Sequence, residues 1–194
     1  KMDIDVQKLG VDFLSLSAHK FYGPKGVGAL YAKNPKILKP LIIGGNQERS
    51  LRAGTENIPY IAAMGLASNL ATKSLKKNIN HLKSLENLFK QKLLDQFKSL
   101  IFNGSQTQKL PGVISVSFPG FSSDILLIRL DREKVYVSNG SACGSGIAKP
   151  SHVLKAIGLD ESTNLSTLRF SFGISNNFEE IETLIHVLKN KILK

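Results

Sequence analysis

Lys20 is the first residue whose position suggests chemistry. Most lysines are solvated surface charges, but Lys20 follows an apolar stretch over residues 11–18 and precedes a glycine-rich turn, so we expect its backbone to be held rigidly. An amine that forms a Schiff base needs such a fixed and partly desolvated place. Ser17 and His19 lie beside it and carry a hydroxyl and an imidazole that can bind a phosphate. This combination suits a cofactor with an aldehyde and a phosphate, which is pyridoxal phosphate.

Cys143, the only cysteine, lies in the segment VSNGSACGSGIAKPS over residues 137–151. A lone cysteine is more often an inert core residue, but its glycine, serine and alanine neighbours offer little apolar surface for packing. We therefore expect an exposed, mobile loop. A thiol on such a tether can act as a nucleophile once it loses its proton, and the pKa of a free thiol is about 8.5. His152 is a candidate neighbour of the thiol, with an ordinary surface histidine as the alternative.

Arg169 lies within the stretch STLRFSFG over residues 166–173, where we expect a strand. An arginine inside a strand is either paired internally or directed at a ligand carboxylate, which its planar fork binds through two oxygens. The sequence leaves both readings open. Thr55, in the segment RAGTEN, has a turn hydroxyl as its favoured role and a phosphate contact as the alternative.

Composition and charge exclude several functional classes. The net charge of +11 comes from 26 Lys and Arg against 15 Asp and Glu, and such a charge can indicate nucleic-acid or acidic protein partners. The lysines are scattered and have no aromatic stacking platform beside them, so we expect a solvated surface and no direct nucleic-acid contact, with an acidic protein partner left open. One cysteine excludes an intrachain disulfide and a cysteine zinc site, and an unpaired thiol fits a reducing compartment. No apolar run approaches the ~18 residues of a membrane span.

The first part of the chain has the pattern of two strands followed by a long loop. The near-continuous apolar run over 11–18 is typical of a strand buried on both faces, and residues 26–32 indicate a second strand. The short connection predicts a hairpin-like pair with Lys20 at its mouth. The loop over 34–57 is longer than most structural loops, which indicates a functional role. Asn57 is expected to cap the helix that follows.

An apolar stripe at helical spacing follows, over residues 58–99. This tract is longer than a usual globular helix, so we expect a break within residues 72–78. The break is the candidate domain boundary. It divides the chain into residues 1–75, expected to be part of a larger domain, and residues 76–194, expected to be a complete small domain.

The second part alternates between strand and helix patterns, which predicts a compact α/β or α+β domain around a small sheet. Strands are expected over residues 99–104, 112–118, 134–138 and 166–173, and helices over 122–133, 151–158 and 176–193. Ser122 or Ser123 is expected to cap the first of these helices, and Gly158 to close the second.

Four motifs in this order resemble the cysteine desulfurases of the NifS/IscS type. They are SAHKFYGPKGVGALY, RAGTEN, SNGSACGSG and LRFSFG. Those enzymes depend on pyridoxal phosphate and belong to the class V aminotransferase group, fold type I. The resemblance therefore implies an α/β fold in which residues 1–75 form the end of the large cofactor-binding domain and residues 76–194 the small C-terminal domain.

The resemblance also implies a role for each cofactor residue. Lys20 would bind the cofactor as a Schiff base and later move protons, while Ser17 and His19 match phosphate-binding positions. Thr55 matches a threonine that reaches the phosphate of the neighbouring subunit, which implies a homodimer. No resident metal is implied, although Cys143 could serve as a transient ligand of an iron–sulfur cluster.

The implied reaction converts L-cysteine to L-alanine. Arg169 matches the arginine that binds the substrate carboxylate, and Cys143 matches the cysteine that takes sulfur as a persulfide. Family members pass that sulfur to iron–sulfur scaffold proteins or tRNA-thiolation proteins, and the implied location is the cytoplasm. A selenocysteine lyase or another class V aminotransferase is the alternative enzyme.

Two departures from the family pattern matter. Ile174 stands where the family often has an arginine. The family enzyme is also about twice as long, and its N-terminal half carries the residues that stack on the cofactor ring and pair with its nitrogen. We therefore expect this chain to be a C-terminal piece of such an enzyme. A non-catalytic piece that acts only as a partner-binding domain is the hypothesis from another class.

Overall fold

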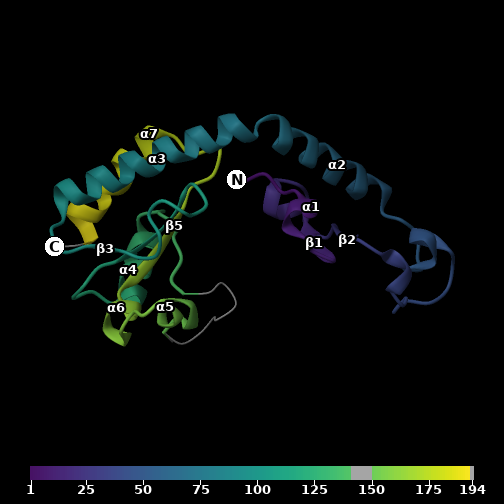
Figure 1. Cartoon of the computed structure of the whole chain (residues 1–194). Helices are drawn as coiled ribbons and strands as arrows, with labels where there is room; N and C mark the ends of the chain where they lie inside the picture. The colour runs from purple at the N-terminus through teal and green to yellow at the C-terminus, as the bar shows by residue number, and fades with distance from the viewer. Residues whose placement is uncertain (141–149, 193–194) are drawn as a thin grey trace. The chain divides into compact units, whose positions relative to one another are not determined.

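The structure is a computed structural model that describes residues 1–140 and 150–192. The chain forms two compact units, Met2–Lys76 and Lys77–Lys194, and Lys1 belongs to the second. Figure 1 shows the elements of both. Their identification as the end of a cofactor domain and a complete small domain stays a prediction.

An antiparallel hairpin forms the centre of the first unit. Strands β1 (Phe13–Ser17) and β2 (Gly28–Ala32) pair along their whole length, from Phe13 opposite Ala32 to Ser17 opposite Gly28. The predicted pair is thereby confirmed. A side chain at Gly28 would collide with the carbonyl oxygen of Leu16, which explains the glycine. The expected burial on both faces is wrong for this chain, because a sheet of two strands leaves most residues of β1 and β2 exposed.

The rest of the first unit is helical or irregular. Helix α1 (Val6–Leu9), which the sequence did not predict, is capped by Asp5, whose carboxylate accepts hydrogen bonds from two backbone N–H groups. The long loop contains two short 3₁₀ turns, Pro35–Ile37 and Gln47–Ser50. Helix α2 (Ile58–Lys73) follows; Asn57 stands at its N-cap position as predicted, but its side chain makes no capping hydrogen bond.

The expected interruption of the long helical tract is present. Helix α2 ends at Ser74, whose N–H returns to Leu70 O at 3.0 Å, and α3 (Leu75–Gln96) begins at the next residue. No side chain of α2 is buried, whereas α3 buries five. Helix α3 therefore contributes side chains to a hydrophobic core, whereas α2 contributes none.

A three-stranded antiparallel sheet organises the second unit. Its strands are β3 (Ile101–Phe102), β4 (Val113–Ser117) and β5 (Thr167–Ser171), in the order β3-β4-β5. Within the described residues of this unit, four helices accompany the sheet and α3. They are α4 (Ser123–Arg132), α5 (His152–Ala156), α6 (Glu161–Leu165) and α7 (Phe178–Val187), the last continuing into a π-helical turn Leu188–Ile192.

The sheet has one apolar and one polar face. Ile114 lies opposite Phe170 and Val116 opposite Leu168, and all four side chains are buried in the core. Helices α3 and α7 lie side by side in Figure 1, and an ion pair between Lys92 and Glu182 joins them at 2.8 Å. The core residues of the helices are Leu82, Leu85, Phe89 and Leu93 of α3, Leu126 and Leu130 of α4, and Ile181, Leu184, Ile185 and Val187 of α7.

The polar face carries hydroxyl groups and an arginine. Ser115 lies opposite Arg169, and Ser117 opposite Thr167. Both Ser117 and Thr167 are buried, and their hydroxyls lie 2.7 Å apart. Because side chains alternate along a strand, Arg169 points to this face while its two neighbours enter the core.

Several expectations for the second unit need correction. Residues 134–138 are not a strand: Lys134 adopts the left-handed conformation (φ +60°) just after α4, and only Ser138 reaches β5, through a single bridge to Arg169. Ser122 occupies the N-cap position of α4 without a side-chain hydrogen bond. Helix α6, which the sequence reading missed, begins at Asp160, whose side chain accepts from Thr163 N–H.

In residues 1–140 and 150–192, no helix is both long enough and apolar enough to cross a membrane.

Candidate functional site

A rigid turn carries Lys20. The chain leaves β1 into a 3₁₀ turn, Ala18–Phe21, which Tyr22 ends in the left-handed conformation (φ 67°). Backbone hydrogen bonds close the turn on both sides, from Ala18 N to Val27 O at 3.1 Å and from Gly23 N to Ala18 O at 2.9 Å. Ala18 is fully buried, and helix α2 packs against the turn. The backbone of Lys20 is therefore held from both strands and from a helix.

The side chains on this turn are accessible. Within the four residues 17–20, only Ala18 is buried. The other three, Ser17, His19 and Lys20, are exposed. A hydroxyl, an imidazole and an amine therefore lie within four consecutive residues, at the end of β1 and the start of the turn. We expected Lys20 to be partly desolvated. Within the first unit, Met2–Lys76, this is not so, because the two-stranded sheet and α2 leave its side chain exposed.

Thr55 lies in the loop that leads into α2 and is exposed. Two contacts shape the backbone just before it: Gln47 Oε1 accepts from Gly54 N at 3.2 Å, and Ala53 N donates to Ile42 O at 3.1 Å. Gly54 itself has φ +114°, a conformation that favours glycine. The Thr55 side chain is therefore exposed at the end of a loop whose backbone is held by hydrogen bonds.

Arg169 lies in the middle of β5 and is half-buried. Its backbone N–H donates to Ser138 O at 2.7 Å and its carbonyl accepts from Ser138 N at 3.2 Å. Its guanidinium Nη1 donates to Gly140 O at 3.4 Å. In the described ranges, 1–140 and 150–192, no carboxylate forms an ion pair with this guanidinium. The role of Arg169, internal pairing or contact with a ligand carboxylate, stays a prediction.

The remaining predicted residues stand as follows. Cys143 lies outside the described residues. His152 is the exposed first residue of α5. Lys20 and Arg169 belong to different units. Ser17, His19 and Lys20 lie within four consecutive residues at the end of β1, and Arg169 is joined to Ser138 and Gly140.

Sequence reasoning missed two polar residues beside the cysteine-bearing segment. Asp124, in the first turn of α4, accepts a hydrogen bond from Asn139 Nδ2. Asn164 of α6 is buried and bonds the backbone of Ser151. The sequence shows an acidic residue at 124 and an amide at 164, each near a strand that we expected beside the segment. Their hydrogen bonds to Asn139 and to the backbone of Ser151 appear only in the folded chain.

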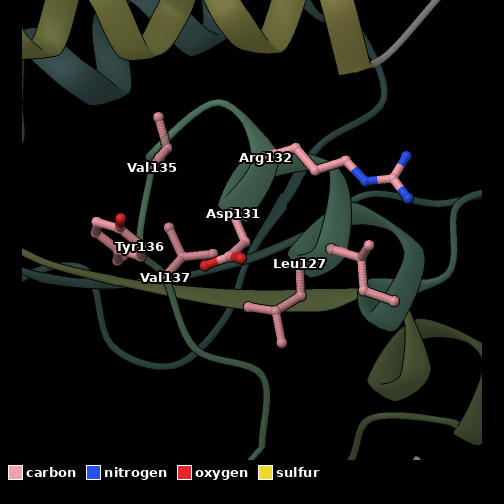
Figure 2. Close-up of a pocket in the computed structure, with 7 residues that line it drawn as sticks. Leu127, Asp131, Arg132, Val135, Tyr136 and Val137 are labelled. Atoms are coloured by element: carbon pink, nitrogen blue, oxygen red, sulfur yellow. The ribbon is translucent and has the colours of Figure 1, made fainter.

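A pocket of about 440 Å³ lies over α4 and the segment that follows it. Figure 2 shows Tyr136 and Val137 on one side and Arg132 extending away from them. The lining residues are Leu127, Ile128, Asp131, Arg132, Val135, Tyr136 and Val137. The lining is mostly apolar and contains none of the site residues predicted from the sequence.

In the part of the chain that the structure describes, no three His, Cys, Asp or Glu side chains gather closely enough to hold a metal ion. The donor set on the Lys20 turn instead fits an organic phosphate with an electrophilic carbon. A hydroxyl and an imidazole can bind the phosphate, and an amine can bond to the carbon.

Comparisons with known proteins identify relatives of this chain. The cysteine desulfurase IscS of Dictyoglomus turgidum is 42% identical over 191 residues, which are 98% of this chain and 48% of that protein. The mitosomal cysteine desulfurase of Encephalitozoon cuniculi is 40% identical over 184 residues, 94% of this chain and 42% of that protein. The chain thus spans about half the length of the curated relatives it matches.

Solved structures show the same likeness. A NifS-like protein superposes with a TM-score of 0.83 at 33% identity, over 95% of this chain and 47% of that one. The NifS-like protein of Rickettsia africae gives a TM-score of 0.83 at 32% identity, over 95% and 48%. These matches confirm the predicted mixed α/β fold of the fold type I enzymes. The model of the family described as aminotransferase class-V matches residues 1–184, and the chain belongs to that family.

Proposed function

We propose that this chain is part of a pyridoxal-phosphate-dependent cysteine desulfurase, which converts L-cysteine to L-alanine and carries the sulfur as a persulfide on Cys143. One observation carries the proposal: Arg169, which no described carboxylate neutralises, is bonded directly to Ser138 and Gly140, just before the segment that holds the thiol. A group suited to an amino-acid carboxylate therefore lies beside residues 138 and 140, which precede the nucleophile in the sequence.

Each of the candidate residues would have a separate role in the reaction. When bound, pyridoxal phosphate would supply an electron sink at the carbon that loses a bond. Lys20 would hold the cofactor covalently and then accept and return protons at its Nζ atom, while Ser17 and His19 bind the phosphate. Thr55 would reach the phosphate of a second copy in a homodimer. The rigid backbone of the turn favours this role, because a proton carrier must be positioned within hydrogen-bond reach of its partner.

The sulfur step would take place at the thiol. Arg169 would hold the substrate carboxylate through two charge-assisted hydrogen bonds. The thiolate of Cys143 would attack the substrate sulfur, forming an S–S bond as the C–S bond breaks. The electron pair of the broken bond would stay with the substrate carbon, which takes a proton to give L-alanine. The persulfide would pass to an iron–sulfur scaffold protein or a tRNA-thiolation acceptor in the cytoplasm.

The test uses the full-length protein loaded with pyridoxal phosphate. With L-cysteine and a thiol reductant, the protein should release alanine and sulfide in equal amounts. Cys143→Ala should abolish both products and leave the cofactor spectrum unchanged, because the variant removes the nucleophile and keeps Lys20. Alanine formation at the wild-type rate by Cys143→Ala would overturn the proposal. Activity with selenocysteine alone would identify the alternative, a selenocysteine lyase.

A further inference from the structure

Ser115 and Arg169 are direct neighbours on the polar face of the sheet. They are register partners in β4 and β5. Phe172 N donates to Gly112 O at 2.7 Å, so that pair is hydrogen-bonded. Bonded and non-bonded pairs alternate along antiparallel strands, and Ser115 lies three residues further on, so it forms a non-bonded pair with Arg169. The Cβ atoms of such pairs are about 4.5–5.5 Å apart. The register therefore brings the Ser115 hydroxyl beside the Arg169 side chain.

The hydroxyl groups on this face form a network in which each proton can be assigned. Thr167 Oγ1 lies 2.8 Å from Thr163 O, and because a carbonyl oxygen only accepts, Thr167 donates its proton there. Ser117 Oγ lies 2.7 Å from Thr167 Oγ1. Since the Thr167 proton is already used, Ser117 is the donor in this second bond. A serine has a single hydroxyl proton, so Ser117 can only accept from a further partner.

Asn103 is that further partner. Its Nδ2 lies 2.8 Å from Ser117 Oγ and 3.3 Å from Ser115 Oγ. Because Ser117 can only accept, the amide must present its N–H groups to these hydroxyls and not its oxygen. Ser115 is therefore an acceptor in its contact with Asn103, and the network makes no use of the Ser115 proton.

Ser115 thus differs from the other hydroxyls of the network. Within residues 1–140 and 150–192, its side chain has one hydrogen bond, the one that it accepts from Asn103. Ser117 and Thr167 are buried, whereas Ser115 and Arg169 are both half-buried and remain accessible in part. A hydroxyl with an unused proton beside a guanidinium is a donor suited to an anion that the guanidinium binds.

We propose that Ser115 is a second binding residue for the substrate carboxylate, and that it donates its hydroxyl proton to the carboxylate that Arg169 holds. This inference rests on the proposed function. Arg169 Nη1 donates to Gly140 O over a long 3.4 Å bond, and a guanidinium has five N–H donors, so donors remain for a ligand. A carboxylate has about four acceptor positions, enough for two bonds from Arg169 and a third from Ser115.

The third bond has a signature that separates binding from folding. It forms only with ligands that carry a carboxylate, so its loss should weaken their binding and leave the binding of a simple amine unchanged. A disturbance of the sheet would weaken both kinds of ligand alike. L-Alanine and ethylamine form a suitable pair of probes, because they differ only by the carboxylate.

The experiment measures binding of both probes by calorimetry, with the full-length protein loaded with pyridoxal phosphate. Ser115→Ala should raise Kd for L-alanine about tenfold, which corresponds to the loss of one hydrogen bond to a charged group. Kd for ethylamine should stay within about twofold of wild type. Ser115→Thr, which keeps the hydroxyl and suits a strand, should restore most of the affinity for L-alanine.

Ser117→Ala is the matched control, since Ser117 lies on the same strand and the same face two residues away. Its hydroxyl is fully used by Thr167 and Asn103. The variant should lower the melting temperature, because it leaves buried partners unsatisfied, and should leave Kd for L-alanine unchanged. The inference is wrong if Ser115→Ala leaves Kd for L-alanine within twofold of wild type, if it weakens ethylamine equally, or if Ser117→Ala weakens L-alanine as much.

Arg169→Ala separates this inference from the proposed function. If Arg169→Ala weakens L-alanine binding and Ser115→Ala does not, the proposed role of Arg169 stands and the inference fails. A wild-type protein that makes no alanine from L-cysteine would refute the proposed function, and the comparison of L-alanine with ethylamine would then decide the inference alone. A wild-type protein that binds L-alanine no better than ethylamine has no carboxylate contact, and this result would overturn the inference.

Discussion

Glu86 Oε1 and Lys109 Nζ lie 2.6 Å apart and join the middle of α3 to the connection between β3 and β4. The same carboxylate pairs with Lys90 at 2.9 Å and accepts from Gly112 N at 3.0 Å, while Lys109 also donates to Val113 O at 2.8 Å. This buried group of contacts fixes the start of β4 on α3. The central strand of the sheet therefore depends on it.

The Glu86 contacts predict a pH dependence of stability. Burial by itself would raise the pKa of Glu86, but the hydrogen bonds from Lys109, Lys90 and Gly112 N–H outweigh it, so the pKa lies below its usual value. A lowered carboxyl pKa stabilises the fold above the pKa of the unfolded chain, about 4.3, and this contribution is lost as the pH falls through the folded value. Urea unfolding at pH 7 and at pH 3 should show the loss.

Glu86→Gln provides the matched test, because it keeps an acceptor for Gly112 and removes the charge. The variant should be less stable at pH 7 by about 1–3 kcal/mol. It should also lose less stability than wild type between pH 7 and pH 3. Equal losses on acidification in both proteins would show that Glu86 does not titrate with folding.

Gly112→Ala should destabilise the second unit for two reasons. Gly112 has φ +73°, a conformation that costs other residues roughly 1–2 kcal/mol. A Cβ there would also lie 3.0 Å from Leu82 Cδ2 and 3.2 Å from Leu82 Cβ, within the core. Gly104→Ala is the control, since Gly104 has φ +76° and an open space where its Cβ would lie. Thermal melts should show a larger decrease in melting temperature for Gly112→Ala than for Gly104→Ala. Equal decreases would mean that the Leu82 side chain moves aside without cost.

Arg169→Ala in the full-length enzyme should raise KM for L-cysteine. Each charge-assisted hydrogen bond to a carboxylate contributes roughly 1.5–3 kcal/mol, so a loss of tenfold or more in affinity is expected. Because the bonds to Ser138 come from the backbone, the fold should persist. Steady-state kinetics measure the effect, with Arg132→Ala, an exposed arginine of the same unit, as control. An unchanged KM in Arg169→Ala would make Arg169 a structural residue.

The 194-residue chain by itself should not retain pyridoxal phosphate. Ser17, His19 and Lys20 are exposed on their turn, and an imine of an exposed lysine hydrolyses readily. After mixing with the cofactor and gel filtration, the absorbance of lysine-bound cofactor should be far below one per chain and similar in Lys20→Ala. A near-stoichiometric band that Lys20→Ala loses would show that the chain completes its own pocket.

Local patterns in the sequence were sufficient for much of the fold. The apolar runs and the short turn predicted the β1–β2 pair, and the length of the apolar stripe predicted the break at Ser74. Both depend on interactions between residues near in sequence, which residue type and spacing report directly. Lys20, His19 and Ser17 were singled out for the same reason, because all three lie within four consecutive residues.

What only the tertiary structure decided involves residues distant in sequence. Residues 134–138 have the composition of a strand, yet a left-handed Lys134 and the single bridge from Ser138 to Arg169 leave them outside the sheet. The environment of Arg169, the bonds of Asn164 to Ser151 and the pairing of Asp124 with Asn139 have no local signature, because each joins a side chain to a segment that the fold brings beside it. The sequence alone determined which residues could do chemistry. Packing of α4 and β5 around one core, with α6 leading directly into β5, decided which of them are held in place, since such contacts form only when the whole unit folds.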